Sequence, residues 1–319
     1  MTPPVRSAGA DAVGRIVVLG SLNTDLVATV RHLPRPGETV LADALRTFPG
    51  GKGGNQAAAA ARLGGAVSMI GRVGSDTFGE DLLASLRRDG VDTSRVARDL
   101  KTPTGTALIL VDPVGENVIA VSPGANATLS DDEVRGALEA VEPGGLLVLQ
   151  LEIPAAVVRQ AIEGARRQKI RVLLNAAPVR EFDASSIDGL DILVANESEA
   201  SALVGRTVTD MSSASDAARE LHDRGVRLAV ITLGAAGSVF CEDGRAERVG
   251  PFTVMAVDST GAGDAFVGAL AVALSEVIAV PDAVRLANAA GAGAASKAGA
   301  QSSLPRRADL ERLFGVRWP

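Results

Sequence analysis

Short aliphatic runs recur along this chain, and most are followed by a stretch with helical periodicity. The runs are bounded by turn residues, which is typical of strands buried on both faces of a sheet. They are Ile16–Gly20, Val67–Ile70, Leu146–Leu149, Arg171–Leu174, Ile192–Val194 and Leu228–Ile231. Amphipathic patterns between them predict helices over Thr77–Asp89, Ser130–Ala140, Pro154–Lys169 and Ser215–Arg224. This alternation predicts an α/β fold with a doubly wound, mainly parallel sheet flanked by helices.

Two segments interrupt the alternation, because neither is followed by a helix. Residues 22–47 contain strand-like pieces around Leu33–Gly37, and the prolines of that stretch exclude it from a central strand. Residues 106–122 have the alternation and turn residues of a β-hairpin. We predict that they form a small protruding β-sheet lid, built discontinuously from about 22–49 and 104–123. The candidates for its buried face are Leu108, Leu110, Ile119 and Val121.

Composition narrows the classes of function. The chain has 32 Lys and Arg against 38 Asp and Glu, a net charge of −6, and the basic residues are dispersed, so no nucleic-acid partner is expected. Cys241 is the single cysteine, which excludes an internal disulfide and a multi-cysteine metal site. No apolar run reaches the roughly 18 residues of a membrane span. We predict a loose N-terminal tail over 1–14, one α/β domain over 15–319, no membrane partner and a cytoplasmic location.

The loop Ser259–Gly263 holds two glycines directly before an almost wholly apolar helical stretch, residues 265–274. Free backbone N–H groups at a helix N-terminus attract phosphate, although a simple packing turn gives the same local pattern. Asp264 follows the loop. Either it is an acid in the first helical turn, or it is a carboxylate beside a phosphate cradle, placed to take a proton from an attacking hydroxyl. The loop is not a P-loop, because the Gly-Lys-Ser/Thr ending is absent.

A second glycine-rich loop, Gly50–Gln56, also opens a helical stretch. Its glycines let the backbone close around a polar ligand, with Lys52 and Asn55 as donors, or else form a flexible surface turn. The stretch Gly20–Asp25 follows the first predicted strand, where ligands bind in doubly wound sheets. Asn23 and Asp25, two positions apart, would face the same side and reach sugar hydroxyls, although an Asx turn also fits.

Asn196 and Glu199 follow another predicted strand, in the spacing of a helix capping box. The alternative is that the amide and the carboxylate lie near Mg²⁺, which prefers hard oxygen ligands. His32 and His222 are the only histidines, and neither belongs to a Ser or Cys constellation. A Ser-His-Asp hydrolase is therefore not predicted, and we expect His222 on a solvated helix face.

In this order, the motifs resemble those of the PfkB-type carbohydrate kinase family, and within it the ribokinase group, from about Ile16 to Leu313. The motifs that support the resemblance are Gly20–Asp25, Pro36–Thr39, Gly50–Gln56, Gly105, Gly115–Asn117, Gln150–Glu152, Asn196–Glu199, Thr232–Gly237, Asp258–Asp264 and Lys297–Gln301. The Asp-x-x-Gly-x-Gly-Asp element at 258–264 is typical of the whole family. The loop at 50–56 and Gln-Leu-Glu at 150–152 favour the ribokinase group.

The resemblance implies a ribokinase-like fold and ATP-dependent phosphorylation of the 5-hydroxyl of D-ribose. It makes Asp264 the expected general base. It assigns the anion hole to the backbone N–H groups of Gly261, Ala262 and Gly263. The residues it assigns to the sugar hydroxyls are Asn23, Asp25, Gly51, Lys52, Asn55, Glu152 and Asp264. Those it assigns to ATP are Asn196, Thr232, Gly234, Gly237, Gly263 and Asn288.

The resemblance also implies two metal ions and a partner. Asn196 and Glu199 would position Mg²⁺, largely through water. A monovalent cation, K⁺, would lie beside the anion hole. Its implied ligands are the Asp258 carboxylate, the carbonyls of Thr260, Ala294, Lys297 and Gly299, and Ser303. The lid would form a homodimer contact.

Two other functions remain open on these residues. The first is another PfkB-type kinase, for deoxyribose, fructose or a nucleoside, since the same base and anion hole serve any primary alcohol. Its discrimination would lie in Asn23, Asp25, Lys52, Asn55 and Glu152. The second is a sugar-binding regulator without phosphoryl transfer. The complete glycine loop together with Asp264 argues against the regulator.

Overall fold

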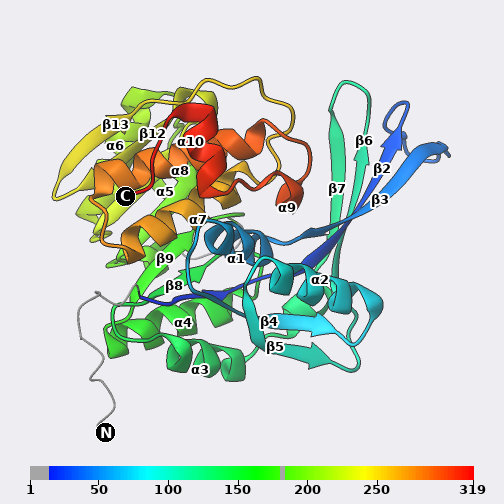
Figure 1. Cartoon of the computed structure of the whole chain (residues 1–319), viewed down its shortest axis with the longest axis horizontal. Coiled ribbons are helices and arrows are strands. Elements are labelled where there is room, and N and C mark those ends of the chain that lie inside the picture. Colours follow the sequence, from blue (N-terminus) through cyan, green and yellow to red (C-terminus); the bar gives the residue numbers. More distant parts are fainter. Residues whose placement is uncertain (1–13, 180–183) are drawn as a thin grey trace, which may run out of the picture.

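A nine-stranded sheet runs through the body of the protein in the order β13-β12-β11-β10-β9-β8-β1-β4-β5 (Figure 1). The computed structural model describes residues 14–179 and 184–319, so the predicted tail lies, apart from Gly14, outside the described residues. The strands are β1 (Ile16–Leu19), β4 (Val67–Gly74), β5 (Asp92–Asp99), β8 (Leu146–Leu149), β9 (Arg171–Asn175), β10 (Ile192–Asn196), β11 (Leu228–Thr232), β12 (Ser238–Glu242) and β13 (Arg245–Val249).

The sheet is parallel from β5 to β11, and β12 and β13 add an antiparallel edge. The six predicted aliphatic runs are the strands β1, β4, β8, β9, β10 and β11. All six are buried at every position or at all but one. A strand covered on both faces is apolar on both faces, which is why continuous apolar runs identified them. The predicted α/β fold class is confirmed.

Helices cover both faces of the sheet (Figure 1). One face carries α1 (Lys52–Arg62), α2 (Thr77–Arg88), α7 (Ala262–Ser275), α8 (Val280–Ala295) and α10 (Arg307–Phe314). The other carries α3 (Asp131–Ala140), α4 (Ala155–Gln168), α5 (Glu197–Val204) and α6 (Met211–Asp223). The short elements are η1 (Gly124–Thr128), η2 (Ala184–Ile187), η3 (Gly234–Ala236) and α9 (Ala300–Ser303). Among the residues described, no helix is long and apolar enough to cross a membrane.

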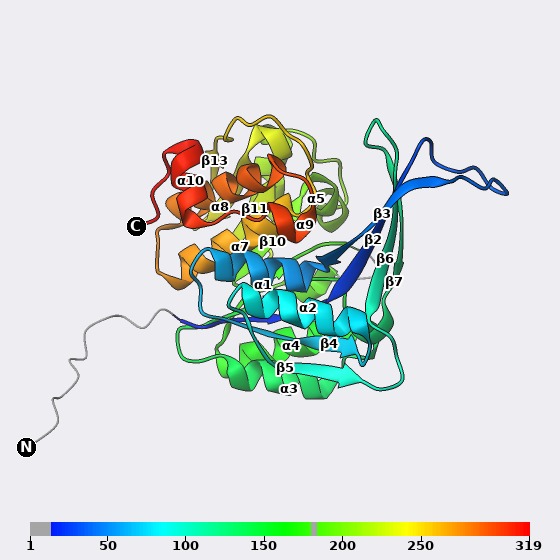
Figure 2. The same cartoon turned by 45° about the vertical axis from the view of Figure 1, so that its right-hand side comes forward.

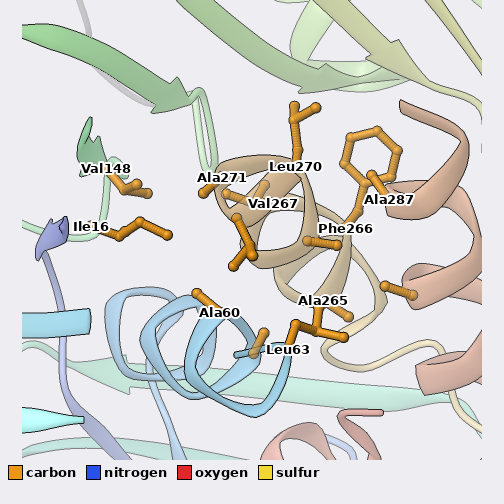
Figure 3. Close-up of a cluster of buried hydrophobic side chains, with 14 of the residues drawn as sticks. Ile16, Ala60, Leu63, Val148, Ala265, Phe266, Val267, Leu270, Ala271 and Ala287 are labelled. Carbon is orange, nitrogen blue, oxygen red and sulfur yellow. The ribbon is translucent and has the colours of Figure 1, made fainter. Parts of the chain in front are cut away.

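Alternate strand residues divide the interior into two cores. In β1, Ile16 and Val18 face the core beneath α1 and α7, whereas Val17 and Leu19 face the core beneath α3 and α4. Figure 3 shows α7 in the first core, with Val267 and Ala271 directed toward the strands and Phe266 toward α8. Helix α7 is buried from Asp264 to Ser275, so its apolar sequence reflects contact on all sides.

Helices α1 and α7 approach each other unusually closely. A Cβ atom on Gly268 of α7 would lie 2.6 Å from Ala59 Cβ and 2.8 Å from the backbone nitrogen of Ala60. Both faces in contact therefore consist of residues without bulk. The alanine-rich sequence of α1 allows this spacing, and the two helix N-termini come to lie side by side at one end of the sheet.

A second sheet stands beside the body, as Figure 2 shows. It has four strands in the order β3-β2-β6-β7, with bounds β2 (Asn23–Val30), β3 (Ala42–Gly50), β6 (Gly105–Val111) and β7 (Asn117–Ser122). We call it the lid sheet. The prolines at 34 and 36 lie in the loop between β2 and β3, as the sequence required. Strands β2 and β6 pair in parallel, whereas the outer pairs are antiparallel.

The prediction that Leu108, Leu110, Ile119 and Val121 form one buried face of the lid sheet is wrong, because these residues lie on two faces. Leu108 and Leu110 pair with Ala120 and Val118, whereas Ile119 and Val121 pair with Ile109 and Ala107. Directly paired residues share a face. The two strands therefore present Ile109, Ile119 and Val121 on an inner face toward the body and Leu108, Leu110 and Val118 on an outer face. The prediction failed because both faces of the hairpin are apolar.

Three strands and one helix start were missed. Strand β5 is largely polar because it is an edge strand. Strands β12 and β13 form a hairpin around Asp243 and Gly244, both with positive φ (49° and 74°), so the Asp-Gly pair was an available signal. Helix α6 begins at Met211 rather than Ser215, after the N-cap Asp210.

The prediction that His222 lies on a solvated helix face is wrong. His222 is half-buried, and its Nε2 accepts a hydrogen bond from Gly244 N (2.9 Å).

The contact between α1 and α7 yields a test of stability. Gly268→Ala adds a methyl group where there is no space, so we expect a loss of about 1–3 kcal/mol in the free energy of unfolding. Gly136→Ala in α3 is the control, since a Cβ there meets nothing within 4 Å. We expect the control to be neutral or to stabilise by up to about 1 kcal/mol. Urea denaturation measures both, and equal stabilities of the two variants would contradict the close contact.

Candidate active site

A cavity of about 410 Å³ lies at the carboxyl ends of the strands, between the body and the inner face of the lid sheet. All seven residues that the sequence assigned to sugar hydroxyls line it: Asn23, Asp25, Gly51, Lys52, Asn55, Glu152 and Asp264. They come from β2, the N-terminus of α1, the loop after β8 and the first turn of α7. The lid contributes apolar side chains at Ile109, Ile119 and Val121. We call this space the sugar cavity, after the residues that the resemblance assigns to a sugar.

The glycines of the 50–54 loop are required by close backbone contact. A Cβ on Gly50 would lie 2.3 Å from the Asp25 carboxylate, and one on Gly53 would lie 2.6 Å from Ser21 N. Gly51 has φ 83° and is the N-cap of α1, a conformation that disfavours other residues. The loop is therefore a packed junction that starts α1 directly against the 20–25 segment, and not a flexible surface turn.

Asn126 orients Asn23. Its amide nitrogen donates to Asn23 Oδ1 (2.7 Å) and to the carbonyl of Leu22 (3.0 Å), and its oxygen accepts from Leu22 N (2.9 Å). Because Asn23 Oδ1 is occupied, the Asn23 amide nitrogen is left to donate into the cavity. Sequence reasoning missed Asn126, which lies in η1 and is distant along the chain from β2.

Ser21 and the start of α1 fix Glu152. The Ser21 hydroxyl donates to Glu152 Oε2 at 2.6 Å, and Lys52 N donates to the same oxygen at 2.9 Å. The other carboxylate oxygen, Oε1, is left as an acceptor for a hydroxyl group of a ligand. Ser21 was missed too, although it lies within the Gly20–Asp25 motif.

The carboxylate of Asp264 is held between two side-chain amides. Asn55 Nδ2 donates to Asp264 Oδ2 (2.9 Å) and Gln56 Nε2 donates to Asp264 Oδ1 (3.0 Å). Asp264 is only 6% exposed, and its remaining surface lines the cavity. Asn55 Oδ1 is buried and has no hydrogen-bond partner among the described residues. An unpaired buried acceptor beside a cavity fits a ligand that brings a hydroxyl donor.

Burial raises the pKa of Asp264, against the opposing effects of Lys52 and of the amides of Asn55 and Gln56. The nearby Glu152 carboxylate raises it further. For Lys52, burial alone would lower the pKa, but the carboxylates of Asp264, Glu152 and Glu199 outweigh burial and raise it. The cavity thus holds a carboxylate with increased proton affinity beside a lysine that stays charged.

Two more carboxylates share this environment. Burial, and then repulsion from Glu152 and Asp264, raise the pKa of Asp25 to about 7. Burial also raises the pKa of Glu199, partly offset by the Asn196 backbone N–H and by Lys52. Several acids around one ammonium group would repel one another, so a ligand that donates hydroxyl hydrogens to them is favoured.

The first turn of α7 exposes backbone donors. Ala262 N donates to the carbonyl of Ser259 (3.1 Å) and Ala265 N to that of Gly261 (2.8 Å). Among the described residues, the N–H groups of Gly261, Gly263 and Asp264 have no partner. Free N–H groups at a helix N-terminus suit an anion. Ala262 was predicted as a donor, but its N–H is already occupied within the turn.

A second cavity, of about 360 Å³, lies beside the sugar cavity. Of the residues assigned to ATP, Thr232, Gly234, Gly237, Gly263 and Asn288 line it, while Asn196 lines the sugar cavity. Most of its wall is apolar, with Phe252, Val254 and Phe266, which suits an aromatic base. The two cavities share Thr232, Ser259 and Gly263. A Cβ on Gly263 would meet nothing within 4 Å, so a side chain there would project into open space beside the free N–H groups.

Asn196 and Glu199 form the capping box that the sequence predicted. Asn196 Oδ1 accepts from Glu199 N (2.9 Å), and Glu199 Oε2 accepts from Asn196 N (2.9 Å). Both residues also line the sugar cavity. In the part of the chain that the structure describes, no group of three or more His, Cys, Asp and Glu side chains is arranged to hold a metal. The free oxygen of Glu199 suits Mg²⁺ held mainly by water and phosphate.

The structure brings together part of the predicted K⁺ site. Asp258 Oδ1 accepts from Thr260 N (2.9 Å) and Oδ2 from Gly299 N (2.8 Å), so this carboxylate joins two loops beside α7. The carbonyl of Ala294 already accepts from Lys297 N (3.1 Å), and the Ser303 hydroxyl donates to the carbonyl of Ala300 (2.8 Å). Ala294 and Ser303 are thus engaged locally, whereas Asp258, Thr260 and Gly299 lie together.

The chain is similar to characterised proteins over most of its length. The family described as pfkB family carbohydrate kinase matches residues 13–307. A ribokinase of Haemophilus influenzae is 38% identical over 292 residues, which are 92% of this chain and 95% of that protein. A deoxyribokinase of Salmonella typhimurium is 37% identical over 291 residues, 91% of this chain and 95% of that protein.

Solved structures give the same result for the fold. The structure of Arabidopsis thaliana ribokinase complexed with ribose and ATP matches with a TM-score of 0.86 and 31% identity. The match covers 95% of this chain and 99% of that one. The lid sheet and the nine-stranded sheet are thus parts of a known architecture, in which that protein binds a pentose and a nucleotide.

Asp25 gives a prediction on pH dependence. Between about pH 4 and pH 7 the folded protein keeps a proton on Asp25 that the unfolded chain has released, so this group makes folding less favourable as pH rises through that window. Asp25→Asn cannot ionise. We therefore expect the variant to exceed the wild type in unfolding free energy by roughly 2 kcal/mol at pH 8 and by almost nothing near pH 3, below the pKa of the unfolded group.

Urea denaturation at the two pH values measures this difference. Asp81→Asn, an exposed site on α2, is the control and should change little at either pH. A stability difference for Asp25→Asn that does not depend on pH would contradict the raised pKa.

Proposed function

The chain belongs to the pfkB family of carbohydrate kinases, and from that membership we propose that it transfers the γ-phosphoryl group of ATP to the 5-hydroxyl of D-ribose. The products are D-ribose 5-phosphate and ADP. The observation that supports this most strongly is the meeting of the two cavities at Gly263, one residue before Asp264. A hydroxyl from one side and a phosphate from the other would meet beside a buried carboxylate and free N–H donors.

Asp264 is the general base in this proposal. The sugar oxygen forms a bond to the γ-phosphorus as the bond from that phosphorus to the bridging oxygen of ADP breaks, and the hydroxyl proton passes to Asp264. A base works best when its pKa lies near the working pH, so the increase that burial causes favours proton acceptance. Asn55 and Gln56 hold both carboxylate oxygens in place during this step.

The free N–H groups of Gly261, Gly263 and Asp264 would stabilise charge on the transferred phosphoryl group. They are fixed by the helix and need no rearrangement, which is the condition under which such donors are most effective. Lys52, half-buried and charged, lies on the sugar side among the carboxylates. It would pair with sugar hydroxyls and offset the repulsion among Asp25, Glu152 and Asp264.

Two metal ions complete the proposal. Asn196 and Glu199 would hold Mg²⁺, largely through water, and this ion would screen the charges of the ATP phosphates. K⁺ would lie at Asp258, Thr260 and Gly299, with Ala294, Lys297 and Ser303 as further candidates. It would stabilise the loop that begins α7.

We therefore expect ATP turnover to be faster in K⁺ salts than in tetramethylammonium salts. Equal turnover in the two salts would contradict the K⁺ site.

Deoxyribose is the second candidate substrate. The Salmonella deoxyribokinase is almost as similar as the ribokinase of Haemophilus. The lid supplies Ile109, Ile119 and Val121 to the cavity, and an apolar wall does not exclude a sugar that lacks one hydroxyl. The hydrogen-bonding residues Asn23, Asp25 and Glu152 favour ribose, because the loss of a hydroxyl would leave one polar group unpaired.

We propose that the enzyme is a homodimer joined through the outer face of the lid sheet. Leu108 and Val118, 55% and 53% exposed, lie on that face with Leu110, and soluble proteins tend to cover such apolar rows. Light scattering that shows only monomer at micromolar concentration would contradict the dimer.

The use of ATP as donor and a single free cysteine fit a cytoplasmic location, which cell fractionation would test. Residues 15–319 would form one kinase domain with the discontinuous lid.

Purified protein should produce ADP in the presence of D-ribose, ATP and Mg²⁺, measured by a coupled assay. A panel of ribose, deoxyribose, fructose and nucleosides at equal concentrations sets the preference, and we expect ribose to have the highest kcat/KM. Strong activity on another acceptor and none on ribose would contradict the substrate and leave the kinase. Ribose binding without any ADP formation would favour a regulator.

Asp264→Asn tests the base. We expect kcat to fall by about 10²–10⁴-fold, because a positioned base contributes that much, while ribose and ATP still bind. Coupled ADP detection gives kcat and isothermal titration gives the binding. Asp81→Asn should match the wild type in both measurements. A near-normal kcat for Asp264→Asn would remove Asp264 as the base.

A further inference from the structure

Behind Asp264 lies a row of buried side-chain amides. Gln56 follows Asn55 in α1 and is 1% exposed, Gln150 follows β8 and is 0% exposed, and Asn175 ends β9 and is 7% exposed. Gln56 and Gln150 do not line the sugar cavity, whereas Asn175 reaches its wall. Three amides in the interior, next to the reacting carboxylate, call for a physical reason, because burying polar groups is costly unless they are paired.

The hydrogen bonds of this row all run in one direction. Gln150 Nε2 donates to Gln56 Oε1 (2.7 Å), and Gln56 Nε2 donates to both Asp264 Oδ1 and Asn175 Oδ1 (3.0 Å each). Asn175 Nδ2 in turn donates to the carbonyl of Val194 in β10 (3.3 Å). Both hydrogens of the Gln56 amide nitrogen and its oxygen therefore take part in hydrogen bonds.

Only one orientation of the Gln56 amide satisfies these partners. If the amide were flipped, its oxygen would face the Asp264 carboxylate and the Asn175 oxygen, and its NH₂ group would face the NH₂ group of Gln150. Each of these contacts would bring like partial charges together. Asn175, whose own amide nitrogen is bound to the Val194 carbonyl, thus forces Gln56 to present its NH₂ group to Asp264, and Gln150 pairs with the remaining Gln56 oxygen.

We propose that Gln56 is a positioning residue for the catalytic base, that Asn175 fixes the orientation of its amide, and that Gln150 supports it by pairing with its oxygen. With Gln56 on Oδ1 and Asn55 on Oδ2, the carboxylate of Asp264 cannot rotate, and its remaining lone pairs stay directed at the sugar cavity. This inference rests on the proposed role of Asp264 in phosphoryl transfer. Gln56 itself lines neither cavity, so it reaches the sugar cavity only through its partners Asp264 and Asn175.

Other charged groups also face Asp264. Lys52 of α1 lowers its pKa and Glu152 after β8 raises it, while Asp25 of β2 and Glu199 of α5 are carboxylates that it repels. None of these four is bonded to Gln56. The hydrogen bond from Gln56 favours the charged form of Asp264, so its loss makes the carboxylate easier to protonate as well as less well oriented.

Gln56→Met removes the donor and keeps the length of the side chain. We expect kcat at neutral pH to fall roughly 10-fold, a part of the 10²–10⁴ that a positioned base supplies. The KM for the sugar should stay within about twofold, because Gln56 is outside the cavity. The acid limb of the kcat profile should move to higher pH, since the base must lose its proton before it can act. Steady-state rates across the pH range measure all three quantities.

Gln150→Met is the second variant. This variant keeps the hydrogen bond from Gln56 to Asp264 and removes only the partner of the Gln56 oxygen. Because a buried, unpaired oxygen loosens the hold on Gln56, the same changes in kcat and in the acid limb should appear, but smaller. If Gln56→Met does not fold, Gln150→Met decides the question alone. An unaltered pH profile in this variant would then overturn the proposal.

Leu63→Val is the matched control for loss of stability. Leu63 is the C-cap of α1, seven residues after Gln56, and is fully buried in the core that contains α7 (Figure 3). The Leu63→Val variant should have a lower Tm than the wild type and an unchanged dependence of kcat on pH. If Gln56→Met behaves like this control, with a lower Tm and the profile of the wild type, its role is structural and the proposal is wrong.

The acceptor in these assays is whichever sugar the wild-type enzyme phosphorylates. A failure of ribose as the substrate therefore leaves this test intact. A near-normal kcat for Asp264→Asn is a separate result, in a different variant, and it would overturn the base and the positioning role together.

Discussion

The close packing of α7 against α1 is the constraint on which the site depends. Gly268 meets Ala59 and Ala60 with no space for a methyl group, so the distance between the two helix axes is set by backbone contact. Helix α7 presents Asp264 and its free N–H groups, and α1 presents Lys52, Asn55 and Gln56. A longer distance between the helices would separate Asp264 from the two amides that hold it. The small residues of both helices therefore help to set the geometry around Asp264.

Electrostatic repulsion is the second feature that shapes the site. Asp25, Glu152, Glu199 and Asp264 surround one lysine, and burial raises the proton affinity of Asp25, Glu199 and Asp264. Such an arrangement destabilises the empty protein, as sites preorganised for a ligand often do. A sugar that donates several hydroxyl hydrogens relieves it. In the proposed mechanism, the acids that would bind the sugar also raise the proton affinity of Asp264.

Much of the fold and of the cavity lining could be predicted from the sequence, because two strong signals were present. Continuous apolar runs mark strands covered on both faces, and the glycine motifs mark backbone contacts that no side chain permits. The edge strand β5, the hairpin β12–β13 and the two faces of the lid sheet were missed or misassigned, since exposed strands are polar and the lid is apolar on both sides. Asn126, Ser21, Gln56 and Gln150 could not be assigned these roles, because their partners are brought near only by the folded chain.

The narrow junction between the two cavities has a consequence for the order of events. Each cavity has its own lining, and they share only Thr232, Ser259 and Gly263. Neither ligand need leave before the other enters, because each has its own space. Initial-rate plots against the two substrates should therefore intersect, as in a sequential mechanism. When the sugar is missing, only water faces the γ-phosphate across the junction, so slow ATP hydrolysis would report how well the lid excludes solvent.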